Sequence, residues 1–234
     1  MKHTAEILTS SIVVIGNFNP AIFTPDWLEL NDLIGEGDAD TVREGSEGRK
    51  MIITRQVTTF ESEWFVLEVL ENKFSLTSKG ALSPAVKDLA VGIFQLVSHT
   101  PIIAVGLNFI GHFKLASEDE YHKIGDILAP KDIWQKLYPN DAPGLADLSI
   151  RIQHGGRGKK LESNDEKRIT VRPSNIFKTG VHLSYNDHRD VRLADEDNPR
   201  PAERVASIID NDWELSWRDA IRVFDGVLTM ALKQ

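Results

Sequence analysis

The chain contains no cysteine among its 234 residues. That absence excludes disulfide bridges, thiolate metal sites, iron–sulfur clusters and a cysteine nucleophile. Long hydrophobic runs are also missing, because no stretch approaches the roughly 18 consecutive apolar residues of a membrane-spanning helix. The first residues, MKHTAEILTSS, lack the apolar core and small-residue cleavage site of a signal peptide. We therefore expect a cytoplasmic protein with no membrane association.

The usual catalytic and cofactor-binding motifs are missing as well. The chain has no GxSxG nucleophile motif, and no GxGxxG follows an expected strand. The seven histidines form no HxH, HExxH or HxxxH pattern, and His182 and His188 are the closest pair. We therefore predict no metal and no cofactor, and we expect a protein that is not an enzyme.

What is present is an ordinary globular composition with an uneven charge. Apolar residues make up 41% of the chain and charged residues 26%, as in soluble domains. The net charge is −8, yet residues 151–185 carry eight basic and three acidic side chains. A protein that binds nucleic acid over its whole surface is usually basic, so only a local basic surface remains possible here.

Two apolar stretches indicate an internal repeat. Residues 11–23 (SIVVIGNFNPAIF) and 101–113 (PIIAVGLNFIGHF) each end an apolar run at a glycine followed by Asn and Phe. The matching positions are Ile12/Ile102, Gly16/Gly106, Asn17/Asn108 and Phe18/Phe109. We interpret both stretches as central strands of a duplicated fold, in which Gly16 and Gly106 allow a bend or bulge.

Each half follows the same predicted order of elements. The first half has a strand at 7–15, a helix from Thr24 to Ile34, a charged loop at 35–49, strands at 50–58, 62–70 and 73–78, and a helix from Ser83. The second half has a strand at 101–113, a helix at 117–127, a short extra helix near 131–137, strands at 147–154, 167–172 and 179–187, and a long helix from Pro201. Residues 1–100 and 101–234 are thus predicted as two half-domains of one compact unit.

The expected fold class is α+β. It is an internally duplicated β-α-β-β-β-α unit whose antiparallel sheet or sheets are covered by helices on one side. In outline this arrangement resembles saddle-shaped folds such as the TATA-box-binding protein, a likeness that implies no function. The long last helix carries Trp213 and Trp217 on its apolar stripe. We favour packing of both against the sheet over an exposed docking stripe, and we interpret Asp210–Asp212 as a kink at most.

The strands of the second half alternate in a way that defines a basic face. Leu148, Ile150, Ile152, Ile169, Val171, Val181, Leu183 and Tyr185 are predicted to face the core. The other face then gathers the candidate binding residues Arg151, Gln153, Arg168, Arg172, His182 and Asn186. Such a face can bind an anionic ligand, a phosphate backbone or an acidic partner. The alternative is a solvated sheet face with cross-strand polar pairs.

Two further segments have ordinary explanations. Residues 154–160 (HGGRGKK) place glycines beside lysines but lack the P-loop spacing, so we predict a basic hairpin tip. Asn186-Asp187-His188 is predicted to cap a turn at the end of a strand, with an acid–base pair as the alternative.

Four short phrases resemble an uncharacterised family of bacterial proteins of about this length. They are GNFNPAIF (16–23), SHTP (98–101), LAPKDIW (128–134) and NDH (186–188). The resemblance implies a prokaryotic cytoplasmic protein with an α+β fold, and it brings no reaction or catalytic residues.

The leading functional hypothesis is a non-catalytic binding or assembly protein. It would dock a protein partner through the basic sheet face or the long helix, for example as a subunit of a bacterial defence or toxin-neutralising complex. One alternative is an enzyme acting on a nucleotide or phosphoester, with arginines holding the phosphate and His182 or His188 as base. The other is a nucleic-acid-binding protein using the basic face at 151–185, but that face has no aromatic stacking groups.

Overall fold

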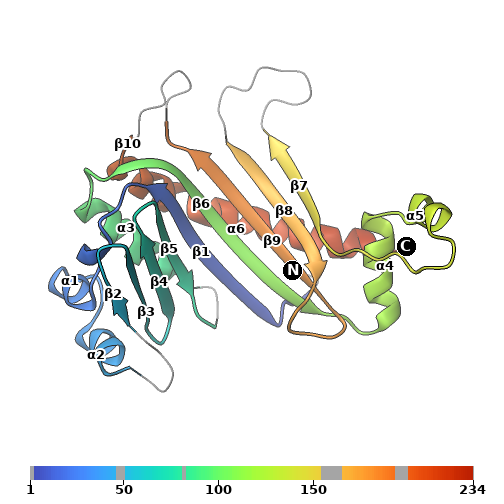
Figure 1. Cartoon of the computed structure of the whole chain (residues 1–234), viewed down its shortest axis with the longest axis horizontal. Helices are drawn as coiled ribbons and strands as arrows, with labels where there is room; N and C mark the ends of the chain where they lie inside the picture. The colour runs from blue at the N-terminus through green and yellow to red at the C-terminus, as the bar shows by residue number, and fades with distance from the viewer. Residues whose placement is uncertain (1–2, 46–50, 81–82, 154–164, 193–199, 234) are drawn as a thin grey trace.

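The structure is a computed structural model that describes residues 3–45, 51–80, 83–153, 165–192 and 200–233. At its centre is one antiparallel sheet in the order β2-β3-β4-β5-β1-β6-β9-β8-β7, with β10 paired to β6 (Figure 1). The strands are β1 (Ile7–Gly16), β2 (Ile52–Ile53), β3 (Val57–Glu61), β4 (Phe65–Leu70), β5 (Lys73–Ser78), β6 (Pro101–Lys114), β7 (Leu148–Gln153), β8 (Glu166–Pro173), β9 (Gly180–Asp190) and β10 (Arg200–Pro201).

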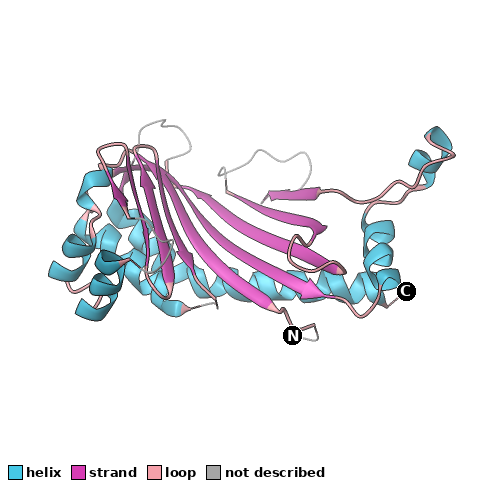
Figure 2. Cartoon of the chain, turned by 60° about the horizontal axis from the view of Figure 1, so that its bottom comes forward, coloured by secondary structure: helices cyan, strands magenta, loops and turns pink. Residues whose placement is uncertain are grey.

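In the part of the chain that the structure describes, helices cover one face of this sheet. They are η1 (Pro20–Ile22), α1 (Pro25–Leu30), α2 (Glu36–Glu44), α3 (Pro84–Leu96), α4 (Glu118–Leu128), α5 (Asp132–Leu137) and α6 (Ala202–Leu232). Figure 2 shows α6 running beneath the sheet, and in the described part of the chain no helix lies over the opposite face. The predicted α+β class, with an antiparallel sheet covered on one side, is therefore confirmed.

The two halves of the chain meet at the middle of the sheet. Strand β1 pairs with β6 from Ile7 opposite His112 to Gly16 opposite Ile102. On one side the order continues through β5, β4 and β3, and on the other through β9, β8 and β7. This order is the one that a duplicated unit requires, while the duplication itself stays a prediction.

The two matched glycines have different roles. The register shifts between Ile15 and Gly16, so the predicted bulge is present there. A Cβ on Gly16 would lie 2.6 Å from the carbonyl oxygen of Pro101, which only glycine allows. The register is unbroken at Gly106, so no bulge forms there. A Cβ on Gly106 would lie 2.9 Å from Nδ2 of Asn186, and this glycine instead makes room for a side chain.

The core lies between the sheet and the helices α3 and α6. The Phe109 ring contacts Trp213 and Trp217 of α6, with ring centroids 5.7 Å and 5.3 Å apart. Packing of both tryptophans against the sheet is thus confirmed. Helix α6 is continuous through Asp210–Asp212, because its buried stripe from Val205 to Ala231 keeps one phase along the sheet.

The region after the first strand differs from the prediction. Helix α1 begins as expected, with Oγ1 of Thr24 accepting from the Trp27 amide at 3.0 Å. It ends at Leu30 rather than Ile34, since Asp32 adopts a left-handed φ of 55°. The charged loop expected at 35–49 is wrong over 36–44, which form α2. The many charges there are the solvated face of a helix whose Ala39 and Val42 are buried.

Two predictions on the second half are also corrected. Ile150 and Ile152 lie on the helix-covered side as expected, but each is 47% exposed because β7 is the last strand. Asn186-Asp187-His188 lie inside β9, which continues to Asp190, so the predicted turn is wrong.

The proposed basic hairpin tip at 154–160 lies outside the described residues. Within the described ranges, no helix has both the length and the apolar character needed to cross a bilayer.

Candidate binding face

The uncovered side of the sheet forms a broad polar surface, here called the open face. Because side chains alternate along a strand, the registers of β1, β6, β9, β8 and β7 determine its members. They include Ser11, Val13, Ile15, Ala104, Gly106, Asn108, Ile110, His112, His182, Ser184, Asn186, His188, Glu166, Arg168, Thr170, Arg172, Ser149, Arg151 and Gln153.

Two shallow hollows of about 460 Å³ and 510 Å³ lie on the open face. They share Val13, Asn108, Thr170, Ser184 and Asn186, so they form one continuous trough across the strands. An open trough of this kind suits an extended partner better than a small molecule, which is usually held in an enclosed pocket.

All six residues predicted as candidate binding residues lie on the open face. Arg151, Arg168 and Asn186 stand opposite one another in one row across β7, β8 and β9, and Asn108 of β6 completes the row. Arg172, His182 and His112 form a second row. Gln153 is at the end of β7, opposite Glu166.

Glu166 neutralises two of these arginines and was missed from the sequence. Its Oε1 accepts from Arg168 at 2.6 Å, and its Oε2 lies 3.1 Å from Nε of Arg151. The two arginines stand directly opposite each other, so the shared carboxylate relieves their repulsion. The sequence could have identified Glu166, because it is two residues before Arg168 and a strand residue at that spacing points to the same face.

Arg172 is different, because none of the described carboxylates lies within ion-pair distance of it. Its Nε donates to Nδ1 of His182 at 3.2 Å. The His182 and His112 rings are edge to face, with centroids 4.8 Å apart. Burial and, to a lesser extent, the charge of Arg172 lower the pKa of His182 to about 4. Burial also lowers the pKa of His112, so both rings are neutral at pH 7.

A pair of amides forms the centre of the trough. Nδ2 of Asn186 donates to Oδ1 of Asn108, whose own Nδ2 donates to the carbonyl oxygen of Ser11 at 3.3 Å. The missing side chain of Gly106 leaves the space that Asn186 occupies. The floor of the trough is therefore fixed by side-chain hydrogen bonds and does not need a ligand to order it.

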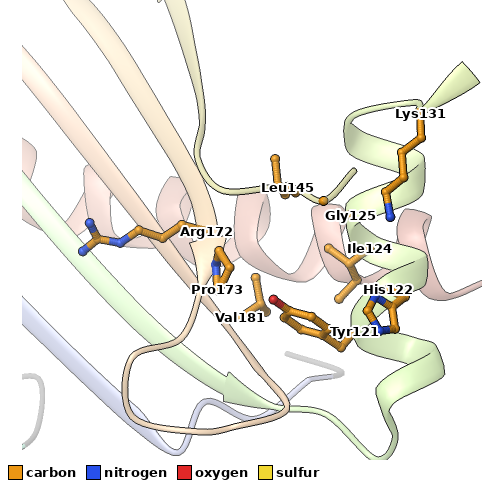
Figure 3. Close-up of a pocket in the computed structure, with 10 residues that line it drawn as sticks. Tyr121, His122, Ile124, Gly125, Lys131, Leu145, Arg172, Pro173 and Val181 are labelled. Carbon is orange, nitrogen blue, oxygen red and sulfur yellow. The ribbon is translucent and has the colours of Figure 1, made fainter. Parts of the chain in front are cut away.

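A third, smaller cavity lies beside α4, outside the trough. It has a volume of about 110 Å³ and is lined by Tyr121, Ile124, Leu145, Pro173 and Val181 among others. Figure 3 shows the Arg172 guanidinium pointing away from the other labelled side chains. Ligand pockets usually measure ~300 to 1,000 Å³, so this cavity is a packing gap under the segment that leads to β7.

The acid–base pair considered for Asp187 and His188 is not formed, since successive residues of β9 point to opposite faces. Asp187 is buried against α6, where it accepts from Ser216 at 2.6 Å and from Arg189 at 2.8 Å. Tyr185 also points to α6 and donates to Asp219 at 2.7 Å. Burial raises the pKa of Tyr185, and its hydrogen bond to Asp219 adds to this. These contacts attach α6 to the sheet.

Among the described residues, no three His, Asp or Glu side chains gather where they could hold a metal ion. The arrangement that remains is a pre-formed polar trough in which the Arg172 guanidinium has no carboxylate within ion-pair distance among the described residues, although Asp147 lines the same hollow. No protein-family model matches this chain, and a search of curated proteins finds no similar sequence.

Proposed function

We propose that this chain is a non-catalytic binding protein that docks an acidic segment of a protein partner on its open face. The observation that carries the proposal is the continuous trough beside Arg172, whose guanidinium has no carboxylate partner among the described residues. Because Arg172 is exposed and has no carboxylate within ion-pair distance among the described residues, its guanidinium is free to bind a carboxylate of a partner.

The composition of the trough indicates a peptide rather than a simple anion. Val13, Ile15 and Ile110 provide apolar surface on β1 and β6, and Ile15 is exposed. The arginines lie to one side of these residues, on β8 and β7. An extended segment with apolar and acidic side chains would match both parts, because contacts to the apolar part give affinity and the charges fix its position.

The absence of stacking groups argues against a nucleic-acid partner. Of the described residues that line the two hollows, Tyr185 is the one Phe, Tyr or Trp, and the other rings there are those of His182 and His188. Its hydroxyl is bonded to Asp219 on the helix side, so its ring is not available on the trough. Proteins that hold single strands on a sheet stack bases on exposed aromatic rings. The net charge of −8 also opposes binding to a polyanion.

The nearest nucleophile–base pair also has a structural explanation. Oγ of Ser174 lies 2.9 Å from Nδ1 of His112. The same oxygen accepts from the amides of Ile176 and Phe177 at 3.1 Å and 3.2 Å, so it caps the turn between β8 and β9. This dual role supports binding over catalysis.

Comparative capture from a native lysate tests the proposal. The double variant R168E/R172E reverses two charges on the open face, and R204E/R218E reverses two exposed charges on α6, beneath the sheet. We expect a partner that is retained by the wild type and by R204E/R218E and lost from R168E/R172E. Retention of the same proteins by both variants would show that the open face is not the docking surface.

A second measurement separates the peptide from a nucleic acid. Fluorescence anisotropy with a single-stranded oligonucleotide of about 20 nucleotides should show no saturable binding at 150 mM salt, a roughly physiological value. Tight, salt-dependent binding that R168E/R172E abolishes would replace the protein partner with a nucleic acid.

A further inference from the structure

Strand β7 ends the sheet, and in the described part of the chain nothing pairs with its outer edge. Its six residues, LSIRIQ, therefore present a row of free backbone donors and acceptors. Native proteins usually block such an edge with prolines, bulges or a covering element. Among the described residues no proline, bulge or covering element blocks Leu148–Gln153, and Arg151 is the one charged side chain along it, so the edge is open to pairing with another strand.

The side chains below this edge are apolar and uncovered. Helix α6 packs under β6 and β9 and does not cover the last strand, so Ile150 and Ile152 are each 47% exposed. Directly above them, on the open face, Ser149 and Arg151 are exposed too. The strand is thus built with one apolar and one polar side, as though a further strand continued the sheet.

Helix α5 stands away from the rest of the molecule, beyond the free edge of β7 (Figures 1 and 2). None of its six residues is buried. Ile133, Trp134, Leu137 and Tyr138 are each more than half exposed. A helix this short is marginal in water without packing, so these side chains require a surface to cover them.

We propose that the missing surface is a second copy of this chain, whose β7 pairs antiparallel with β7 about a two-fold axis at Ile150. In this register Leu148 faces Ile152 of the other copy, and Ser149 faces its Arg151. Apolar residues meet below the sheet and polar residues above it. A register centred on Arg151 would place two arginines opposite each other, which is unfavourable.

The available area fits a dimer once α5 takes part. Six apolar side chains are exposed on β7, on α5 and at Tyr138 directly after it. Each has a total surface of roughly 200 Å², and about half of it is exposed, which gives on the order of 600 Å² per copy. A stable interface buries about 800 Å² per partner. The backbone of the edge and the polar side chains supply the rest, whereas the strand alone would be too small.

This dimer does not depend on what the open face binds. A two-fold axis perpendicular to the sheet leaves both open faces on the same side of one continuous sheet. The two troughs would then lie side by side, and a partner with two acidic segments could occupy both.

Single-cysteine variants test the register directly, because the chain has no cysteine of its own. Opposite residues in an antiparallel pair have Cα atoms about 5 Å apart, within the ~4.4 to 6.8 Å that a disulfide requires. In I150C the two thiols face each other across the axis. In the control I152C they are four residues apart along the strands, ~13 Å. We expect mild oxidation to form a disulfide between two copies of I150C, and to leave I152C and L30C without a covalent cross-link.

Sedimentation velocity provides the independent measurement. The wild type should sediment as a dimer of the 26.2 kDa chain at micromolar concentration. I150K and W134A should shift it to monomer, while L30K, at an even more exposed apolar position on α1, should not. S149E should tighten the dimer by facing Arg151, and S149R should loosen it. A wild type that stays monomeric up to about 100 µM, or equal cross-linking of I150C and I152C, would overturn the proposal.

Discussion

Arg172 donates a hydrogen bond from Nε to Nδ1 of His182, and the two side chains face each other across β8 and β9 on the open face. This contact requires an unprotonated His182, since a protonated ring has no acceptor at Nδ1. The charge at the trough is therefore held by the arginine alone at neutral pH. Protonation of His182 would replace its hydrogen bond with Arg172 by a repulsion between two positive charges.

Acid should destabilise the fold between pH 6.5 and pH 4 because of His182. Its pKa is about 4 in the folded chain against 6.5 in the unfolded chain. In that window the unfolded state binds more protons, so stability is fully present above pH 6.5 and falls as the pH decreases. The loss should be roughly 2 to 4 kcal/mol. Urea unfolding at pH 7.5 and 4.5 measures it, and H182Q should show a shallower pH dependence. If the unfolding free energy fell equally steeply with pH in H182Q, the loss of stability would come from other titratable groups.

Removing the Glu166 carboxylate should make the open face a better anion binder. E166Q leaves Arg151 and Arg168 without the charge that now neutralises them. We expect E166Q to elute from a heparin column at higher salt than the wild type, because each uncompensated cation adds to polyanion affinity. E214Q makes the same change in net charge on α6. Elution of both variants at the same salt concentration would contradict a special role for this face.

The contact between Tyr185 and Asp219 should contribute strongly to stability. Burial raises the pKa of the Asp219 carboxyl, but hydrogen bonds from Lys167, Tyr185 and Arg222 outweigh this and lower it to about 2. Y185F removes a hydrogen bond to a charged group and should cost about 1.5 to 3 kcal/mol. E214A, which breaks the exposed pair with Arg218 on the same helix, should cost under about 0.5 kcal/mol. Denaturant titration of both variants makes the comparison, and equal losses would be evidence against this attachment of α6.

Two glycine substitutions should change the stability of the fold in opposite directions. G16A places a methyl group 2.6 Å from the Pro101 carbonyl oxygen and should destabilise the fold by about 1 to 3 kcal/mol. G37A lies in α2 with open space around its Cβ, and should stabilise by about 0.5 to 1 kcal/mol through helix propensity. Thermal unfolding monitored by circular dichroism distinguishes them. If G16A left the melting temperature unchanged, β1 and β6 would be able to move apart at the bulge.

The alternating pattern of the second-half strands was enough to identify the open face, because a period of two sorts side chains without knowledge of the partners. Three features could not be predicted from the alternating pattern alone. The pairing of Arg172 with His182 depends on the register set by the turn at 174–179. Glu166 lay one residue outside the predicted strand. The exposure of Ile150 depends on where α6 runs, since an apolar strand residue has the same sequence signature whether or not a helix covers it.

The β1–β6 ladder also has a consequence for the order of folding. Strand β1 is made early in synthesis, and its partner β6 follows about a hundred residues later at Pro101–Lys114. Until then, a nascent sheet of β2 to β5 and β1 would expose an apolar edge at what becomes its middle. Such an edge is a site for misassociation between chains. The strand that joins the halves in the finished protein is therefore the one most in need of protection while the protein is being made.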